Sequence, residues 1–132
     1  MNRLDATVTA IREHEGVSRI VFDANGTSLA MVGLEPPHGL TEGCGVTLGI
    51  KATHIILSLG RPEGLGLFNA LPVTVTRMER GEILTSLRLS YHEKTLEAIT
   101  PSATADALSL ETGLSLWALF QESELSILEV KS

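Results

Sequence analysis

The sequence predicts a mainly β protein built from two tandem five-stranded β-barrel modules, with a short helix in the second module. Two observations support this fold class. The chain repeats itself, and each copy of the repeat contains five short apolar runs of the strand type, bounded by turn residues. The 132 residues allow two small modules. A module of about 65 residues buries too little surface to be robust alone, so we expect the two to associate or to oligomerise.

The repeat is clearest at the start of each copy. Residues 2–9 (NRLDATVT) and residues 69–76 (NALPVTVT) share Asn, Leu, Thr, Val and Thr at an offset of 67, from Asn2 to Asn69. After the third strand the register shifts by three, and residues 40–43 (LTEG) match residues 110–113 (LETG). The repeat predicts a first module over 1–59, a linker over 60–66 and a second module over 67–132.

Alternating or continuous apolar residues place the strands. We expect them around 8–10, 20–22, 29–32, 46–50 and 55–57 in the first copy, and around 73–75, 87–89, 96–99, 116–120 and 125–127 in the second. Asn25 and Gly26 form a strong hairpin signal, because both residues tolerate a positive φ. Five short strands in a copy of this length are typical of a partly open barrel of the OB type.

A helix is expected after the third strand of the second copy. Thr100 is suited to the N-cap and Pro101 to the first helical position, and alanines follow. A helix start presents free N–H groups, so with the hydroxyls of Thr100 and Ser102 it suits a small oxyanion. The alternative is a plain structural cap. In the first copy, Glu35 and a Pro-Pro pair occupy the matching segment, which disfavours both a helix and an anion there.

Lys51 is the second candidate for anion binding. It follows the apolar run 46–50, so it would place a positive charge at a barrel rim, with Thr53 as a nearby hydroxyl donor. The alternative is an ordinary solvated lysine. In the second copy Gln121 stands at this position, which keeps a donor and loses the charge.

The residues resemble those of the molybdate-binding Mop/TOBE family, whose free-standing tandem members are called molbindins. The resemblance is carried by residues 66–75 (GLFNALPVTV), 97–100 (EAIT), 110–113 (LETG) and 50–58 (IKATHIILS). It implies a pair of OB-like barrels that binds molybdate or tungstate for molybdenum storage, homeostasis or sensing. It also implies oligomers, with oxyanion sites between modules or subunits.

The resemblance also implies a set of site residues. The family's Ser-Ala-Arg-Asn opening falls on residues 66–69, where only Asn69 is retained. The family's threonine and serine at the helix start fall on Thr100 and Ser102. Its lysine and the following hydroxyl residue fall on Lys51 and Thr53, and Ser123 is that hydroxyl position in the second copy. The expected oxyanion-binding set is therefore Lys51, Thr53, Asn69, Thr100, Ser102 and Ser123.

Charge and composition argue against other classes of function. The net charge of −6 and the scarcity of aromatic residues disfavour direct nucleic-acid binding. The histidines and the single cysteine show no metal-ligand spacing, and no nucleophile motif occurs, so we expect no catalytic site, metal site or cofactor. Neither a signal peptide nor an 18-residue apolar run is present, which favours the cytoplasm and no membrane partner.

Two functions from different classes remain. The first is a protein that binds a small oxyanion. The alternative is a degenerate tandem module that serves as an oligomerisation or partner-binding domain without a ligand. The missing Ser-Ala-Arg and the disrupted first copy motivate the alternative.

Overall fold

The computed structural model describes residues 1–131 and is mainly β structure, with one short α-helix in the second half. The first half contains β1 (Asn2–His14), β2 (Val17–Ala24), β3 (Thr27–Gly33), β4 (Gly45–Ile50), the 3-10 helix η1 (Ala52–His54) and β5 (Ile56–Ser58). The second half contains β6 (Asn69–Arg80), β7 (Leu84–Tyr91), β8 (Lys94–Pro101), α1 (Ser102–Ala107), β9 (Ser115–Phe120), the 3-10 helix η2 (Glu122–Glu124) and β10 (Ser126–Lys131). Within the described residues, no helix is long and apolar enough to span a membrane.

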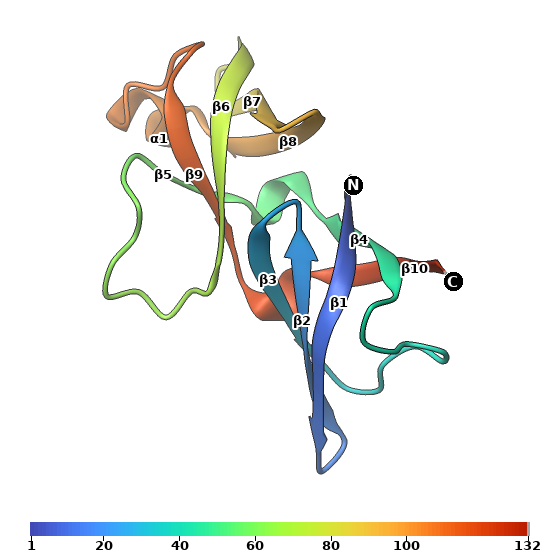
Figure 1. The fold of residues 1–132 in the computed structure, drawn as a ribbon. Coiled ribbons are helices and arrows are strands. Elements are labelled where there is room, and N and C mark those ends of the chain that lie inside the picture. Colours follow the sequence, from blue (N-terminus) through green and yellow to red (C-terminus); the bar gives the residue numbers. More distant parts are fainter. Residues whose placement is uncertain (132) are drawn as a thin grey trace.

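The strands form two curled five-stranded sheets, each an OB-like half of the molecule (Figure 1). This arrangement confirms the predicted fold class and the helix of the second copy. All ten expected strands are present. The halves also share an irregularity, because β1 has a bulge at Thr9 and β6 has one at the equivalent Thr76. The Thr9 hydroxyl donates to the carbonyl of Val21, and the Thr76 hydroxyl donates to that of Arg88, each on the neighbouring strand.

The fifth strands are exchanged between the halves, which the sequence did not predict. The first sheet has the order β10-β4-β1-β2-β3, and the second has the order β5-β9-β6-β7-β8. Figure 1 shows β10, at the end of the chain, running beside β4 of the first half. Each sheet is therefore completed by a strand from the other half.

One continuous hydrophobic core joins the two sheets. It contains Phe22 and Leu48 from the first half and Leu89 and Phe120 from the second, all almost fully buried. The Tyr91 hydroxyl extends across the boundary and donates to the carbonyl of Ala24. The halves thus share both strands and core.

The predicted turns are correct, and one predicted cap is wrong. Asn25 and Gly26 adopt φ values of 53° and 94°, which the tight β2–β3 hairpin requires. Thr100 is not the N-cap of α1. The β7–β8 ladder continues past Thr100 to Pro101, which pairs with Leu84, so the helix begins one residue later and Pro101 takes the N-cap position without a side-chain cap.

Candidate functional site

Lys51 and Thr53 lie on η1, where the first half meets the second sheet. Lys51 occupies the N-cap position of η1, and both side chains are exposed. The preceding residue, Ile50, pairs with Asn2, whose side chain is bonded to Glu97 of β8. η1 itself packs against β8. The fold therefore brings η1, with Lys51 and Thr53, against the strand that carries Thr100.

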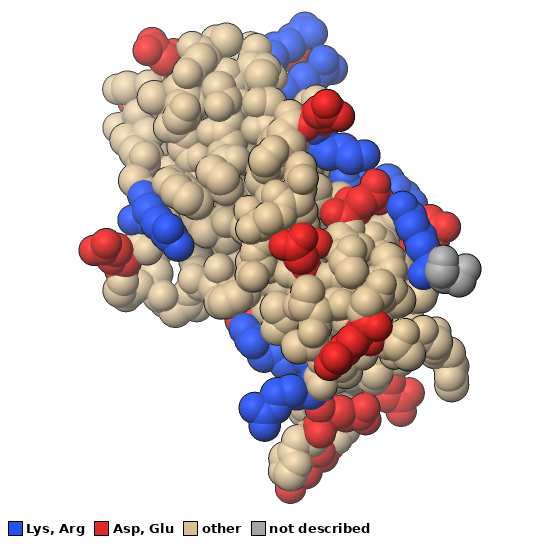
Figure 2. Space-filling model, viewed as in Figure 1, with Lys and Arg blue, Asp and Glu red and all other residues tan. Residues whose placement is uncertain are grey.

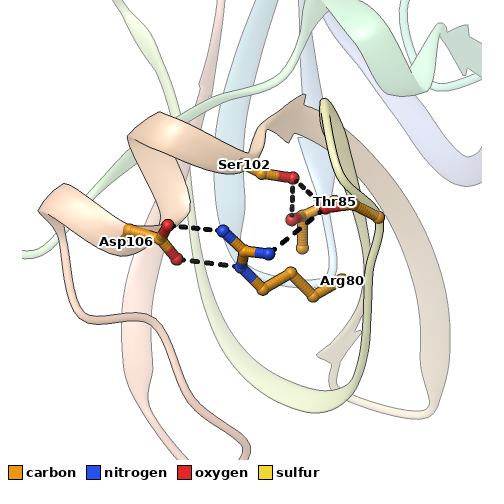
Figure 3. Close-up of polar contacts among 5 residues, drawn as sticks. Arg80, Thr85, Ser102 and Asp106 are labelled. Carbon is orange, nitrogen blue, oxygen red and sulfur yellow. Dashed lines mark hydrogen bonds and ion pairs between the residues drawn. The ribbon is translucent and has the colours of Figure 1, made fainter.

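Thr100 and Ser102 lie at the end of β8 but are placed differently. The Thr100 side chain is largely buried, and within residues 1–131 it makes no side-chain hydrogen bond. Ser102 is 1% exposed. Its hydroxyl donates to the Gly81 carbonyl at 2.7 Å and lies 2.8 Å from the Thr85 hydroxyl (Figure 3). Its N–H donates to the carbonyl of Ile83 at 2.7 Å. Ser102 thus fastens α1 to the β6–β7 hairpin.

An ion pair reinforces this junction. The Arg80 guanidinium donates to both Asp106 oxygens, at 3.1 Å and 2.6 Å (Figure 3). These hydrogen bonds hold the pKa of Asp106 below its ordinary value and raise that of Arg80. The ion pair therefore ties the last turn of the six-residue helix α1 to the β6–β7 hairpin.

Asn69 is fully buried, and its amide is used internally. Its side-chain oxygen accepts from the N–H of Ala30 at 2.7 Å, and its side-chain nitrogen donates to the carbonyl of Ala30 at 2.9 Å. Asn2 makes the same pair of bonds to Glu97. Both asparagines therefore fasten one half to the third strand of the other. Asn69 has one side-chain N–H left for a ligand, because its side-chain oxygen and its other N–H are both bonded to Ala30.

Ser123 lies on η2, the second-half counterpart of η1. Together with Gln121, Glu122 and residues 66–68 it lines an open hollow of about 430 Å³. The structure thus brings Ser123 to the segment where the family's Ser-Ala-Arg opening falls. Two carboxylates flank the serine, those of Glu122 and Glu124. η1 carries Lys51 and His54 at comparable places, so of the two turns it has the more favourable charge for an anion.

Arg19 is a candidate that the sequence analysis missed. Its guanidinium donates to both carboxylate oxygens of Glu122, at 2.8 Å and 3.3 Å, and lies 5.1 Å from the centre of the Phe68 ring. It therefore places an arginine beside the position where the family pattern has one. No local motif marks Arg19, because it comes from the middle of β2 and the repeat places Ser86 at the equivalent position.

His54 and Glu124 connect the two 3-10 helices. Nδ1 of His54 lies 2.9 Å from a carboxylate oxygen of Glu124, although the angles do not meet those of a good hydrogen bond. The two residues are equivalent under the offset of 70, so the contact lies at the pseudo-twofold axis of the repeat. This contact joins the two turns that carry Lys51 and Ser123.

Comparison with solved structures identifies the same architecture elsewhere. A crystal structure of ModG, described as a cytoplasmic molybdate-binding protein and determined with molybdate bound, superposes with a TM-score of 0.88. The match covers 96% of this chain and 94% of the other, at 22% sequence identity. The chain has the fold of ModG. No protein-family model and no curated protein sequence matches it. The resemblance found in the sequence is thus confirmed at the level of the fold, over both halves.

Proposed function

We propose that this protein binds a small tetrahedral oxyanion, molybdate or tungstate, in the cytoplasm and without catalysis. The observation that supports the proposal most strongly is the ModG fold over nearly the whole chain, since that protein was crystallised with molybdate. The proposed roles are storage, homeostasis or sensing of molybdenum.

The proposed site centres on η1. Lys51 supplies the positive charge, Thr53 supplies a hydroxyl, and Thr100 of the adjoining β8 has a hydroxyl without a partner in the described chain. An ammonium group and hydroxyls are donors that suit an oxyanion. In this proposal Asn69 and Ser102 act indirectly, because they fix the strands around the site. Ser123 lies in the second turn, where two glutamates weaken the attraction for an anion.

Isothermal titration of the purified chain with molybdate, tungstate and sulfate tests this function. We expect saturable binding of molybdate or tungstate. Lys51→Ala should weaken it about 10- to 100-fold, because a hydrogen bond from a charged donor contributes about 1.5–3 kcal/mol. Thr53→Ala should weaken it about fivefold, since a neutral bond contributes about 1 kcal/mol.

Gln121→Ala is the matched control, because Gln121 holds the place of Lys51 in the second half and also precedes a 3-10 helix. Its affinity should remain close to that of the parent. Equal losses in Lys51→Ala and Gln121→Ala would contradict the assignment to η1. An absence of binding by the parent protein would contradict the proposed function.

A ligand-free assembly module is the second candidate function. It is favoured by two features: Phe68 occupies the place of the family arginine, and Ile83 and Leu84 expose apolar side chains at the β6–β7 hairpin. Sedimentation velocity distinguishes the two candidates. An oligomer that is insensitive to molybdate and to Lys51→Ala, from a parent protein that binds no oxyanion, would favour the assembly module.

A further inference from the structure

A second hollow on the molecule lies apart from η1 and is lined by aromatic and hydroxyl side chains. It has a volume of about 340 Å³ and lies between the β2–β3 hairpin, the outer face of β6 and β9, and the segment that joins the two halves. Its principal lining residues are Thr27, Ser28, Arg61, Phe68, Pro72 and Trp117. We refer to these six residues as the aromatic groove.

The groove gathers all the aromatic surface that the fold does not use for its core. Phe22, Tyr91 and Phe120 are each at most 1% exposed. The two remaining aromatic residues are Phe68, which is 46% exposed, and Trp117, which is half-buried, and both line the groove. In a chain with few aromatic residues, this placement concentrates the available stacking surface at one point.

The charge of the groove is positive although the protein is acidic. Arg61 is its only charged lining residue, and its guanidinium lies 5.5 Å from the centre of the Trp117 ring. Figure 2 shows a broad surface over β9 and β6 with few charged side chains, bordered by acidic and basic groups. An anion that reaches the groove therefore meets a cation held against an aromatic face and no opposing carboxylate among the lining residues.

The backbone of β3 adds fixed polar groups. β3 is an edge strand, and the N–H and C=O of Ala30 point away from β2 toward Asn69. Because strand residues alternate, Ser28, two positions earlier, presents its N–H and C=O on the same open edge. Neither group has a partner within residues 1–131. A donor and an acceptor thus stand beside the aromatic rings.

The equivalent place in the other half has a different character. The repeat relates Pro72 to Asp5 and Thr27 to Lys94. There Asp5 forms ion pairs with Lys131 at 3.0 Å and with Lys94 at 3.5 Å, so both lysines have a carboxylate partner. The aromatic groove has no such internal partner for Arg61 among the described residues.

We propose that the aromatic groove binds a small planar aromatic molecule that carries a carboxylate or phosphate group. The ring packs against Phe68 and Trp117, the anionic group meets Arg61, and the Ser28 backbone and the Thr27 hydroxyl fix its orientation. The volume lies at the lower end of the range for small-molecule sites, which suits a single ring system. This site is separate from the oxyanion site on η1.

Trp117 is the only tryptophan of the chain, so its fluorescence reports on the groove directly. The probes are AMP and nicotinate, which differ in the anionic group, with adenosine and nicotinamide as neutral counterparts and inorganic phosphate as the anion alone. We expect saturable quenching by AMP, nicotinate or both. The neutral counterparts should bind about tenfold more weakly, because they lack the charged bond to Arg61. Because AMP and nicotinate also differ in their rings, the comparison of each probe with its own neutral counterpart measures what the phosphate or the carboxylate contributes.

Variants decide whether quenching arises in the groove. Arg61→Gln and Phe68→Leu should each weaken binding about tenfold while the melting temperature stays close to that of the parent. Arg88→Gln, an exposed arginine outside the groove, should have no effect. The proposal is overturned if no probe gives saturable quenching at about 5 mM, a concentration that would detect millimolar affinity. It is also overturned if neutral probes bind equally well, or if both groove variants bind like the parent.

Discussion

The side-chain amides of Asn2 and Asn69 each form two hydrogen bonds with the backbone of an edge strand, as the backbone of a neighbouring strand would do. The amide of Asn69 completes the open edge of β3, and that of Asn2 completes the edge of β8. A buried backbone group without a partner is costly, so these two residues hold the halves together at symmetric points. Their occurrence at the same place in both copies was visible in the sequence. The resemblance implies a ligand contact for Asn69, and the structure shows that its amide joins the two halves.

Asn69→Ala should therefore destabilise the protein strongly. The change leaves the N–H and C=O of Ala30 buried without partners, which costs about 2–4 kcal/mol. Asn2→Ala is the matched control. Asn2 is 9% exposed where Asn69 has no exposed surface, so water can satisfy part of the loss. In urea unfolding, the free energy of unfolding should be highest for the parent, lower for Asn2→Ala and lowest for Asn69→Ala. Equal stability of Asn69→Ala and the parent would contradict the structural role.

Asp106 provides a prediction about pH. Its pKa is lowered by the hydrogen bonds from Arg80, so the pair stabilises the folded state fully above the ordinary value of 3.8. This contribution is lost as the pH falls through the lowered value, when the carboxylate takes up a proton. Asp106→Asn should be less stable than the parent at pH 6 and should approach it at pH 2. Thermal unfolding across this range measures the difference, and a constant difference would refute the assignment.

Arg19 and Thr100 are two residues whose structural roles could not be predicted from the sequence. Arg19 reaches Glu122 and Phe68 only because β2 and η2 lie together in the fold, and these residues are far apart in the chain. Thr100 has the local chemistry of an N-cap, but the ladder continues to the pair of Leu84 and Pro101, so the helix begins only at Ser102. A long-range contact determines where the Arg19 side chain lies and where the helix after Thr100 begins. Local sequence propensity carries no information about such contacts.

At the scale of elements, the exchange of β5 and β10 is the central feature. Periodicity located all ten strands, because alternation of apolar residues depends only on the strand itself. It could not identify which sheet each fifth strand joins, because the pairing of β10 with β4 and of β5 with β9 depends on contacts across the repeat. η1 and η2 come immediately before these exchanged strands, so the exchange also positions Lys51 against β8.

The exchange predicts that neither half folds alone. A fragment of residues 1–62 lacks β10, and a fragment of residues 63–132 lacks β5, so each sheet loses an edge strand and each half loses the other half's side of the shared hydrophobic core. Each fragment should show a non-cooperative thermal transition by circular dichroism. Their mixture should recover a cooperative transition and elute as a complex. A fragment that folds cooperatively as a monomer would show that the halves are independent domains.

At the scale of the whole molecule, the two halves share a fold and differ in chemistry. The η1 turn carries Lys51 and His54, whereas the η2 turn carries Glu122 and Glu124. The net charge of −6 means that an anion is attracted only where local cations are arranged for it. The duplication thus supplied two equivalent turns, and we propose that only the one on η1 holds the oxyanion.

The most direct test of oxyanion binding is equilibrium dialysis of the full chain against molybdate in the presence of excess sulfate, with retained molybdenum measured by mass spectrometry. We predict that the parent and Gln121→Ala retain molybdenum to saturation despite the sulfate, and that Lys51→Ala retains much less at the same free molybdate concentration. Retention that sulfate abolishes, or that survives unchanged in Lys51→Ala, would contradict a molybdate site on η1.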